Sequence, residues 1–163
     1  MSYEFARLEM LIGENGIQKL KGSSVAIFGI GGVGSYAAET LARSAVGKII
    51  LVDFDKISES NIIRQIHSLK STVGLNKAEV MGERIKDINP ECEVIKEINL
   101  LKENNIKEFF EKYNPDFVID AIDMVKTKAM LIAYCSQNNI NIISSMGFGN
   151  NMFPEMLEIC DIY

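Results

Sequence analysis

The sequence predicts an α/β protein of the Rossmann type, with a doubly wound, mainly parallel sheet and helices on both faces. Short apolar runs alternate along the chain with segments of helical periodicity, and this alternation favours right-handed crossovers between parallel strands. The first apolar run leads directly into a glycine-rich loop, Gly29-Ile30-Gly31-Gly32-Val33-Gly34, and the second ends on Asp53. A length of 163 residues suits one nucleotide-binding domain over residues 1–163.

The expected elements follow this alternation. Residues 1–22 are expected to form a helical extension outside the sheet, broken by Gly13 and Gly16. The residue stretch 152–163 lacks a helical pattern and is interpreted as a strand without a partner. Between these segments the pattern predicts strands over 25–28, 49–53, 93–95, 117–120 and 141–144, and helices over 34–44, 79–88, 106–113 and 126–138.

Composition narrows the function classes. The apolar runs are too short to cross a bilayer, and the first residues lack a signal-peptide pattern, so we expect a cytoplasmic protein with no membrane partner. A net charge of −5 argues against a large nucleic-acid footprint on this chain alone. Cys92, Cys135 and Cys160 stand apart without a C-x-x-C pair, which favours small buried residues over a zinc site or disulfides.

The glycine-rich loop lies between a predicted strand and a predicted helix, the context in which it binds phosphate. Gly29 allows a tight turn, Gly31 lets the backbone approach a phosphate, and Gly34 permits close helix packing. The start of the helix then presents free N–H groups to an anion. Asp53 can accept ribose hydroxyls. These residues predict a nucleotide site, but they leave NAD, FAD and ATP open.

Charged residues further along the chain favour a triphosphate. Arg64 and Lys77 follow the second strand on its ligand side and could reach the β- and γ-phosphates. The acidic stretch Asp120-Ala121-Ile122-Asp123 ends the fourth strand, and one of its carboxylates could hold Mg²⁺ against a phosphate. Capping of a helix is the other role open to these two aspartates.

Together these positions resemble the ubiquitin-activating-type adenylyltransferases, the family of ThiF, MoeB and HesA. The resemblance spans almost the whole chain and implies that these positions bind ATP with Mg²⁺, and that a substrate carboxylate attacks the α-phosphate. It further implies a homodimer in which Arg7 reaches into the partner's ATP site. It assigns catalysis to Arg7, Arg64, Lys77 and Asp123, the last also holding Mg²⁺, and nucleotide binding to Gly29, Gly31, Gly32, Gly34, Asp53, Asp55, Asn61 and Gln65.

Within that family, four stretches are similar to the tRNA threonylcarbamoyladenosine dehydratases: residues 25–35, 61–67, 73–81 and 118–123. The similarity implies a tRNA substrate whose threonylcarbamoyl carboxylate is adenylated and then closed to a cyclic form. Members of the family continue past the position of Tyr163, so the resemblance implies that a C-terminal part with a substrate-facing loop and a cysteine is missing here.

Two other functions stay open at this stage. One is adenylation of the C-terminal glycine of a ubiquitin-like sulfur-carrier protein, with that carrier or a sulfurtransferase as partner. Such enzymes often hold zinc through two C-x-x-C pairs, which this sequence lacks. The other is an NAD-dependent oxidoreductase, which would leave Arg64, Gln65 and Lys77 without a role.

Overall fold

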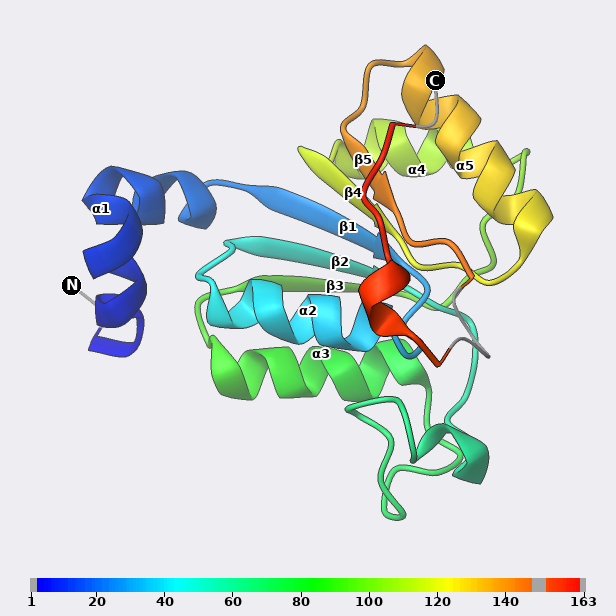
Figure 1. Ribbon diagram of the computed structural model, residues 1–163, viewed down its shortest axis with the longest axis horizontal. Coiled ribbons are helices and arrows are strands. Elements are labelled where there is room, and N and C mark those ends of the chain that lie inside the picture. Colours follow the sequence, from blue (N-terminus) through cyan, green and yellow to red (C-terminus); the bar gives the residue numbers. More distant parts are fainter. Residues whose placement is uncertain (1–2, 148–151, 162–163) are drawn as a thin grey trace.

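The fold is a five-stranded, fully parallel sheet, seen in a computed structural model that describes residues 3–147 and 152–161 (Figure 1). The strand order is β3-β2-β1-β4-β5, so the chain winds outward from β1 in one direction and then in the other. A crevice forms where the winding direction reverses, between β1 and β4. The strands are β1 (Ser24–Phe28), β2 (Lys48–Val52), β3 (Glu93–Glu97), β4 (Phe117–Asp120) and β5 (Ile142–Ser144).

Helices cover both faces of the sheet (Figure 1). On one face α2 (Gly34–Arg43) and α3 (Lys77–Ile88) pack on alternate residues of the central strands, among them Ile27. On the other face α4 (Ile106–Tyr113) and α5 (Val125–Gln137) pack on the intervening residues, including Phe28. Burial on both faces explains why the central strands are apolar runs without polar alternation. Each fully buried Ile or Leu contributes about 1.5–3 kcal/mol.

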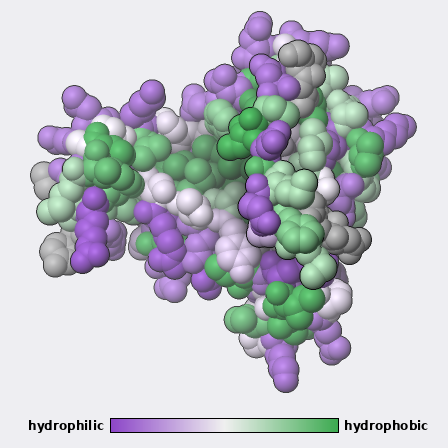
Figure 2. Space-filling model, viewed as in Figure 1, coloured by the Kyte–Doolittle hydropathy of each residue, from purple (hydrophilic) through white to green (hydrophobic). Residues whose placement is uncertain are grey.

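A kinked helix lies beyond the amino ends of the strands (Figure 1). After a short 3₁₀ turn, η1 (Tyr3–Phe5), α1 (Ala6–Lys21) bends at Gly13, whose φ of 74° suits glycine. The expected break at Gly16 is wrong, because Gly16 keeps a helical backbone beneath the Ile12 side chain. The turn back at Gly13 lets Phe5 pack on Ile17 and Ala45. Met10 and Leu11 of α1 are exposed, and Figure 2 shows hydrophobic residues at the surface in the region of α1.

The expected strands and helices are confirmed, with bounds that shift by one or two residues. Helix α3 starts at Lys77 and β3 continues to Glu97. The expected strand over 152–163 is wrong for its described part, where residues 152–161 contain the 3₁₀ turn η3 (Pro154–Met156) and no strand. Pro154 explains the difference, since it fixes φ and has no N–H to donate to a sheet. No helix within residues 3–147 and 152–161 is long and apolar enough to span a membrane.

The glycine-rich loop packs directly on the turn that follows β4. Gly29 has a φ of 87°, and a Cβ there would lie 2.6 Å from the carbonyl oxygen of Ala121. A Cβ at Gly34 would overlap the carbonyl oxygen of Gly29. Both neighbours are backbone atoms, which cannot rotate aside as a side chain would. The two glycines therefore let β1, α2 and the 121–124 turn meet at one edge of the sheet.

Substitution of Gly34 should be strongly destabilising for this reason. We expect Gly34→Ala to lower the free energy of unfolding by at least about 3 kcal/mol, because backbone overlap has no cheap relaxation. Urea denaturation measures the change. Gly22→Ala is the matched control, since a Cβ at Gly22 would lie 3.4 Å from its nearest neighbour, the Gln18 carbonyl oxygen, and a change within about 1 kcal/mol is expected. Equal effects of the two substitutions would contradict the steric argument.

Candidate functional site

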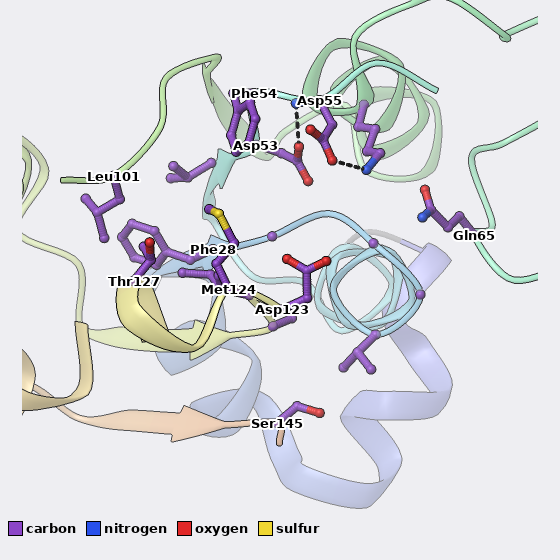
Figure 3. A pocket seen from close by; sticks show the side chains of 18 of the residues that line it. Phe28, Asp53, Phe54, Asp55, Gln65, Leu101, Asp123, Met124, Thr127 and Ser145 are labelled. Atoms are coloured by element: carbon purple, nitrogen blue, oxygen red, sulfur yellow. Dashed lines mark hydrogen bonds and ion pairs between the residues drawn. The ribbon is translucent and has the colours of Figure 1, made fainter. Parts of the chain in front are cut away.

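A cavity of about 400 Å³ opens at the carboxyl ends of the strands, at the reversal between β1 and β4. Loops that follow all five strands contribute to its wall (Figure 3). Ten of the twelve site residues expected from the sequence line it: Gly29, Gly31, Gly32, Asp53, Asp55, Asn61, Arg64, Gln65, Lys77 and Asp123. Gly34 lies just behind the wall, where it supports the glycine loop. The twelfth, Arg7, is treated below.

Asp53 is buried at the end of β2, and its carboxylate is held by the backbone. Its Oδ2 accepts the N–H of Ile30 at 2.6 Å, and its Oδ1 accepts the N–H of Asp55 at 2.8 Å. Burial raises the pKa of this carboxyl, and the two backbone N–H groups oppose that rise. A carboxylate has about four acceptor positions. Asp53 can therefore hold the glycine loop and still accept a hydroxyl from a ligand.

Lys77 is held at the cavity by Asp55. The Lys77 Nζ lies 2.7 Å from Asp55 Oδ2, and the Lys77 side chain is 8% exposed. The Lys77 backbone N–H also donates to the Asp55 carbonyl oxygen at 3.0 Å. These two contacts place the ammonium at the first residue of α3, on the wall of the cavity. Asp55 thus acts on Lys77 in this structure, although the sequence analysis expected it to contact the nucleotide.

Asn61 builds the turn that carries Arg64 and Gln65. Its side-chain Oδ1 accepts the Ser58 N–H at 3.0 Å, and its carbonyl oxygen accepts the backbone N–H groups of Arg64 and Gln65 at 3.1 and 3.0 Å. The Arg64 side chain is exposed, and its Nη1 donates to the Ser60 carbonyl oxygen at 2.8 Å. A guanidinium has five N–H donors, so most of them can serve an anion in the cavity.

The two aspartates after β4 have different surroundings. Asp120 is fully buried, and its Oδ2 accepts from Lys128 Nζ at 2.7 Å and from Ser144 Oγ at 2.6 Å. Its Oδ1 accepts the Ile122 N–H at 3.0 Å. Asp123 is exposed, and Figure 3 shows its carboxylate pointing toward the glycine loop. Of the two carboxylates that the sequence left open for a cation, Asp123 is the accessible one.

One end of the cavity is apolar. Phe28, Val52, Leu101 and Met124 line it beside Asp53 (Figure 3). This combination suits a flat aromatic base, with the carboxylate of Asp53 in reach of the attached sugar. Sequence motifs did not indicate this end, because Leu101 comes from the loop after β3, which carries no motif. Its position after a strand of a parallel sheet was the available signal.

A metal site made by the protein alone is not present in the described part of the chain. No group of three or more His, Cys, Asp or Glu side chains lies together there. A divalent cation at Asp123 would therefore need most of its oxygen ligands from phosphate and water, as is usual for Mg²⁺. The exposed carboxylate of Asp123 at the cavity wall fits that mode of binding.

The cysteines stay outside the site. Cys92 and Cys135 are buried as expected, and burial raises the pKa of both thiols, that of Cys135 to about 12. Both therefore remain protonated and unreactive at neutral pH. The expectation of burial is wrong for Cys160, which is exposed in the segment after η3. No cysteine of the described residues lines the cavity.

Arg7 lies on α1, at the opposite end of the molecule from the cavity (Figure 1). Its side chain is exposed, and it does not line the cavity of its own chain. The strands separate the two regions, since α1 packs near their amino ends. If Arg7 contacts a nucleotide, that nucleotide is held by another copy of the chain.

The comparisons with known proteins agree with this geometry. The model of the ThiF family matches residues 5–156. The chain belongs to the ThiF family. Within this family it is 48% identical over 162 residues to the tRNA threonylcarbamoyladenosine dehydratase of Bacillus subtilis, a match that covers 99% of this chain and 63% of the relative.

Solved structures of the family share the fold. The E. coli tRNA N6-threonylcarbamoyladenosine dehydratase TcdA, in complex with ATP, superimposes with a TM-score of 0.90 at 43% identity, over 93% of this chain and 62% of that one. The same enzyme is known in complex with AMP. A ThiF relative with another activity, the adenylyltransferase and sulfurtransferase MOCS3 of Drosophila yakuba, is 36% identical over 130 residues, covering 78% of this chain and 28% of the relative. This chain spans about three fifths of the length of the bacterial dehydratases that it matches.

His67 lies in the segment between the Arg64 turn and α3, and it is buried. Neither ring nitrogen has a hydrogen-bond partner among the residues that the structure describes. Burial, with the nearby charges of Lys77 and Arg84, lowers the pKa of His67 to about 4. The imidazole is therefore neutral at pH 7. A buried, neutral imidazole that does not line the cavity is suited to packing rather than to acid–base catalysis.

This histidine should make the fold sensitive to acid. Its pKa is about 4 in the folded chain, below its ordinary value of 6.5, so the unfolded chain binds the proton more readily. Stability is then complete above pH 6.5 and is lost as the pH falls toward 4, by up to about 3 kcal/mol. Urea unfolding at pH 7 and pH 4.5 measures the loss. His67→Leu should lose clearly less over this interval, and an equal loss in both proteins would contradict the assignment.

Proposed function

We propose that the full-length protein is an ATP-dependent adenylating enzyme that activates the threonylcarbamoyl carboxylate of tRNA N6-threonylcarbamoyladenosine and closes it to the cyclic form. One observation carries the proposal: Arg64, Lys77 and Asp123 line the same cavity as the glycine loop and Asp53. A dinucleotide site does not need two cations and a second carboxylate at its phosphate end. The bacterial relatives that match 97–99% of this chain are dehydratases of this modified tRNA.

The cavity offers a place for each part of ATP. The apolar end receives the base, Asp53 accepts the ribose hydroxyls, and the glycine loop binds the phosphates through the backbone N–H groups of Gly31, Gly32 and Val33, which line the cavity. The E. coli relative is known in complex with ATP. We therefore assign residues 1–163 to nucleotide binding, with residues 1–22 as the helical extension.

The charges around the phosphates can promote adenylation. An oxygen of the substrate carboxylate attacks the α-phosphorus, the bond to pyrophosphate breaks, and an acyl-adenylate forms. Arg64 and Lys77 reduce the repulsion between the two anions and stabilise the charge on the departing pyrophosphate. Mg²⁺, held by Asp123 and phosphate oxygens, would add to this neutralisation. The carboxylate is already ionised, so this step needs no general base. In the second step a heteroatom of the carbamoyl group attacks the activated carbonyl carbon and closes the ring. The bond to AMP breaks, and the proton of the attacking group passes to water.

Loss of either cation should slow the first step. We expect Arg64→Ala or Lys77→Met to reduce pyrophosphate release by the full-length protein, with the modified tRNA and ATP, by about 10²–10³-fold. Lys70→Met is the control, because Lys70 is an exposed lysine of the same segment outside the cavity. Unchanged rates in the Arg64 and Lys77 variants would refute the proposal. Thermal-shift titration with MgATP and with NAD identifies the preferred nucleotide independently.

We further propose that the protein acts as a homodimer in which Arg7 of one subunit completes the site of the other. The position of Arg7, away from the cavity of its own chain, supports this arrangement. The exposed Met10 and Leu11 on the same helix provide apolar surface for the contact.

Mixing two inactive variants tests this arrangement. Arg7→Ala and Lys77→Met should each be inactive alone, whereas a mixed dimer holds one site with both residues intact. An equimolar mixture should regain about a quarter of the wild-type rate after subunit exchange, because half of the dimers are mixed and each has one complete site. A mixture of Arg7→Lys with Lys77→Met tests whether a positive charge at position 7 is sufficient without the guanidinium group. No recovery in any mixture would show that Arg7 does not act across subunits.

Adenylation of a ubiquitin-like sulfur carrier is the second candidate, and the similarity to MOCS3 favours it. The first step is chemically the same, because the substrate is again a carboxylate. Incubation with such a carrier and ATP, followed by mass spectrometry, separates the two functions. An added AMP mass on the carrier supports the second candidate, and AMP release that requires the modified tRNA supports the first.

A further inference from the structure

Lys128 on α5 is a buried lysine whose hydrogen-bonding capacity is fully used within the protein. Its side chain is 9% exposed. Its Nζ donates to Asp120 Oδ2 at 2.7 Å, to the Ser145 carbonyl oxygen at 2.8 Å and to Ser144 Oγ at 3.2 Å. An ammonium has three donors, so none is left for a ligand. Lys128 cannot act on a substrate directly, and its effect must pass through the groups that it holds.

The groups held by Lys128 begin two walls of the cavity. Asp120 ends β4, and its second oxygen accepts the Ile122 N–H, which sets the turn that leads to Asp123. Ser144 ends β5, and Ser145 is the first residue of the 145–147 segment that lines the cavity. The Ser145 N–H donates in turn to the Asp120 carbonyl oxygen at 2.8 Å. One ammonium thus joins both walls at the end of the cavity where Asp123 lies.

Burial of the Lys128–Asp120 ion pair costs desolvation free energy, so stability alone does not explain it. Two charges must leave water, and a well-packed apolar pair of similar volume often stabilises a fold as well or better. The neighbours of Lys128 on the same helix, Leu131 and Cys135, are fully buried in the core on this face of the sheet. An apolar residue at position 128 would continue that pattern, but it could not orient the Asp120 carboxylate or bind the Ser145 carbonyl oxygen.

We propose that Lys128 is a positioning residue for the metal–phosphate end of the site. It orients the turn that carries Asp123 and the segment that starts at Ser145, so that a nucleotide with β- and γ-phosphates and a bound cation is preferred over one that lacks them. This inference rests on the proposed ATP-dependent function and assigns a residue that neither the sequence motifs nor cavity contacts identify. At the base and ribose end, Asp53 and Leu101 come from the loops after β2 and β3, and the carboxylate of Asp53 accepts from Ile30 and Asp55 rather than from the groups that Lys128 holds.

The two ends of the site can be probed with two nucleotides. AMP needs the base and ribose end, whereas MgATP also needs the end at Asp123. We expect Lys128→Met in the full-length protein to weaken MgATP binding by about tenfold or more, since small displacements of positioned groups have effects of this size. AMP binding should stay within about twofold of wild type in isothermal titration calorimetry. Lys126→Met, an exposed lysine on the same helix, should bind both nucleotides as the wild type does.

Lys128→Met leaves the Asp120 carboxylate buried without its cation, and this variant could fail to fold for that reason alone. A second variant keeps the test decisive in that case. Asp120→Asn with Lys128→Met removes both charges and should recover the melting temperature while the preference for MgATP over AMP stays reduced. Recovery of that preference together with stability would overturn the proposal, as would equal losses for both nucleotides in Lys128→Met. Failure of the wild type to bind MgATP would instead overturn the proposed function and this inference with it.

Discussion

The carboxylate of Asp53 is the group on which the arrangement of the site depends. Through two backbone N–H groups it joins the end of β2 to the glycine loop at Ile30 and to the start of the next loop at Asp55. Asp55 in turn holds Lys77 at the beginning of α3. One buried carboxylate therefore joins the end of β2, the glycine loop and the start of the next loop, and it helps to place a phosphate-binding loop and a cation on the same cavity. The cost of burying it is visible in its raised pKa.

A division of roles among the charged residues recurs around the cavity. Asp123 is exposed and follows the buried Asp120, whereas Lys77 is buried and is held by the exposed Asp55. Asp120 fixes the backbone of the turn that leads to Asp123, and Asp55 fixes the Lys77 ammonium at the wall of the cavity. Such pairs are a physical way to keep a charged group ordered at an exposed wall, because a flexible side chain would lose conformational entropy when a ligand binds.

The sequence predicted the fold and most of the site, and the differences have physical reasons. The spacing of apolar residues was sufficient to predict the strands, and the glycines between a strand and a helix were sufficient to predict the loop at Gly29. Both signals are local in the sequence. The role of Lys128 could not be found in this way, because its partners Asp120 and Ser144 come from two strands that only the tertiary fold brings together. Leu101 was missed because the loop after β3 carries no motif, and only its position after a strand pointed to the cavity. Pro154, by contrast, was a local signal against a strand that the sequence analysis did not apply.

The pairing of β1 with β4 has a consequence for how the chain reaches its folded state. The two central strands are far apart in sequence, and the Ser24 N–H meets the Asp116 carboxylate across 92 positions. Contacts of such separation form late because a long loop must close first. Until then β1 has an unpaired edge, which is a template for association with other chains. The cavity lies on this junction, so a nucleotide that contacts the ends of both β1 and β4 would stabilise the long-range pairing of the sheet.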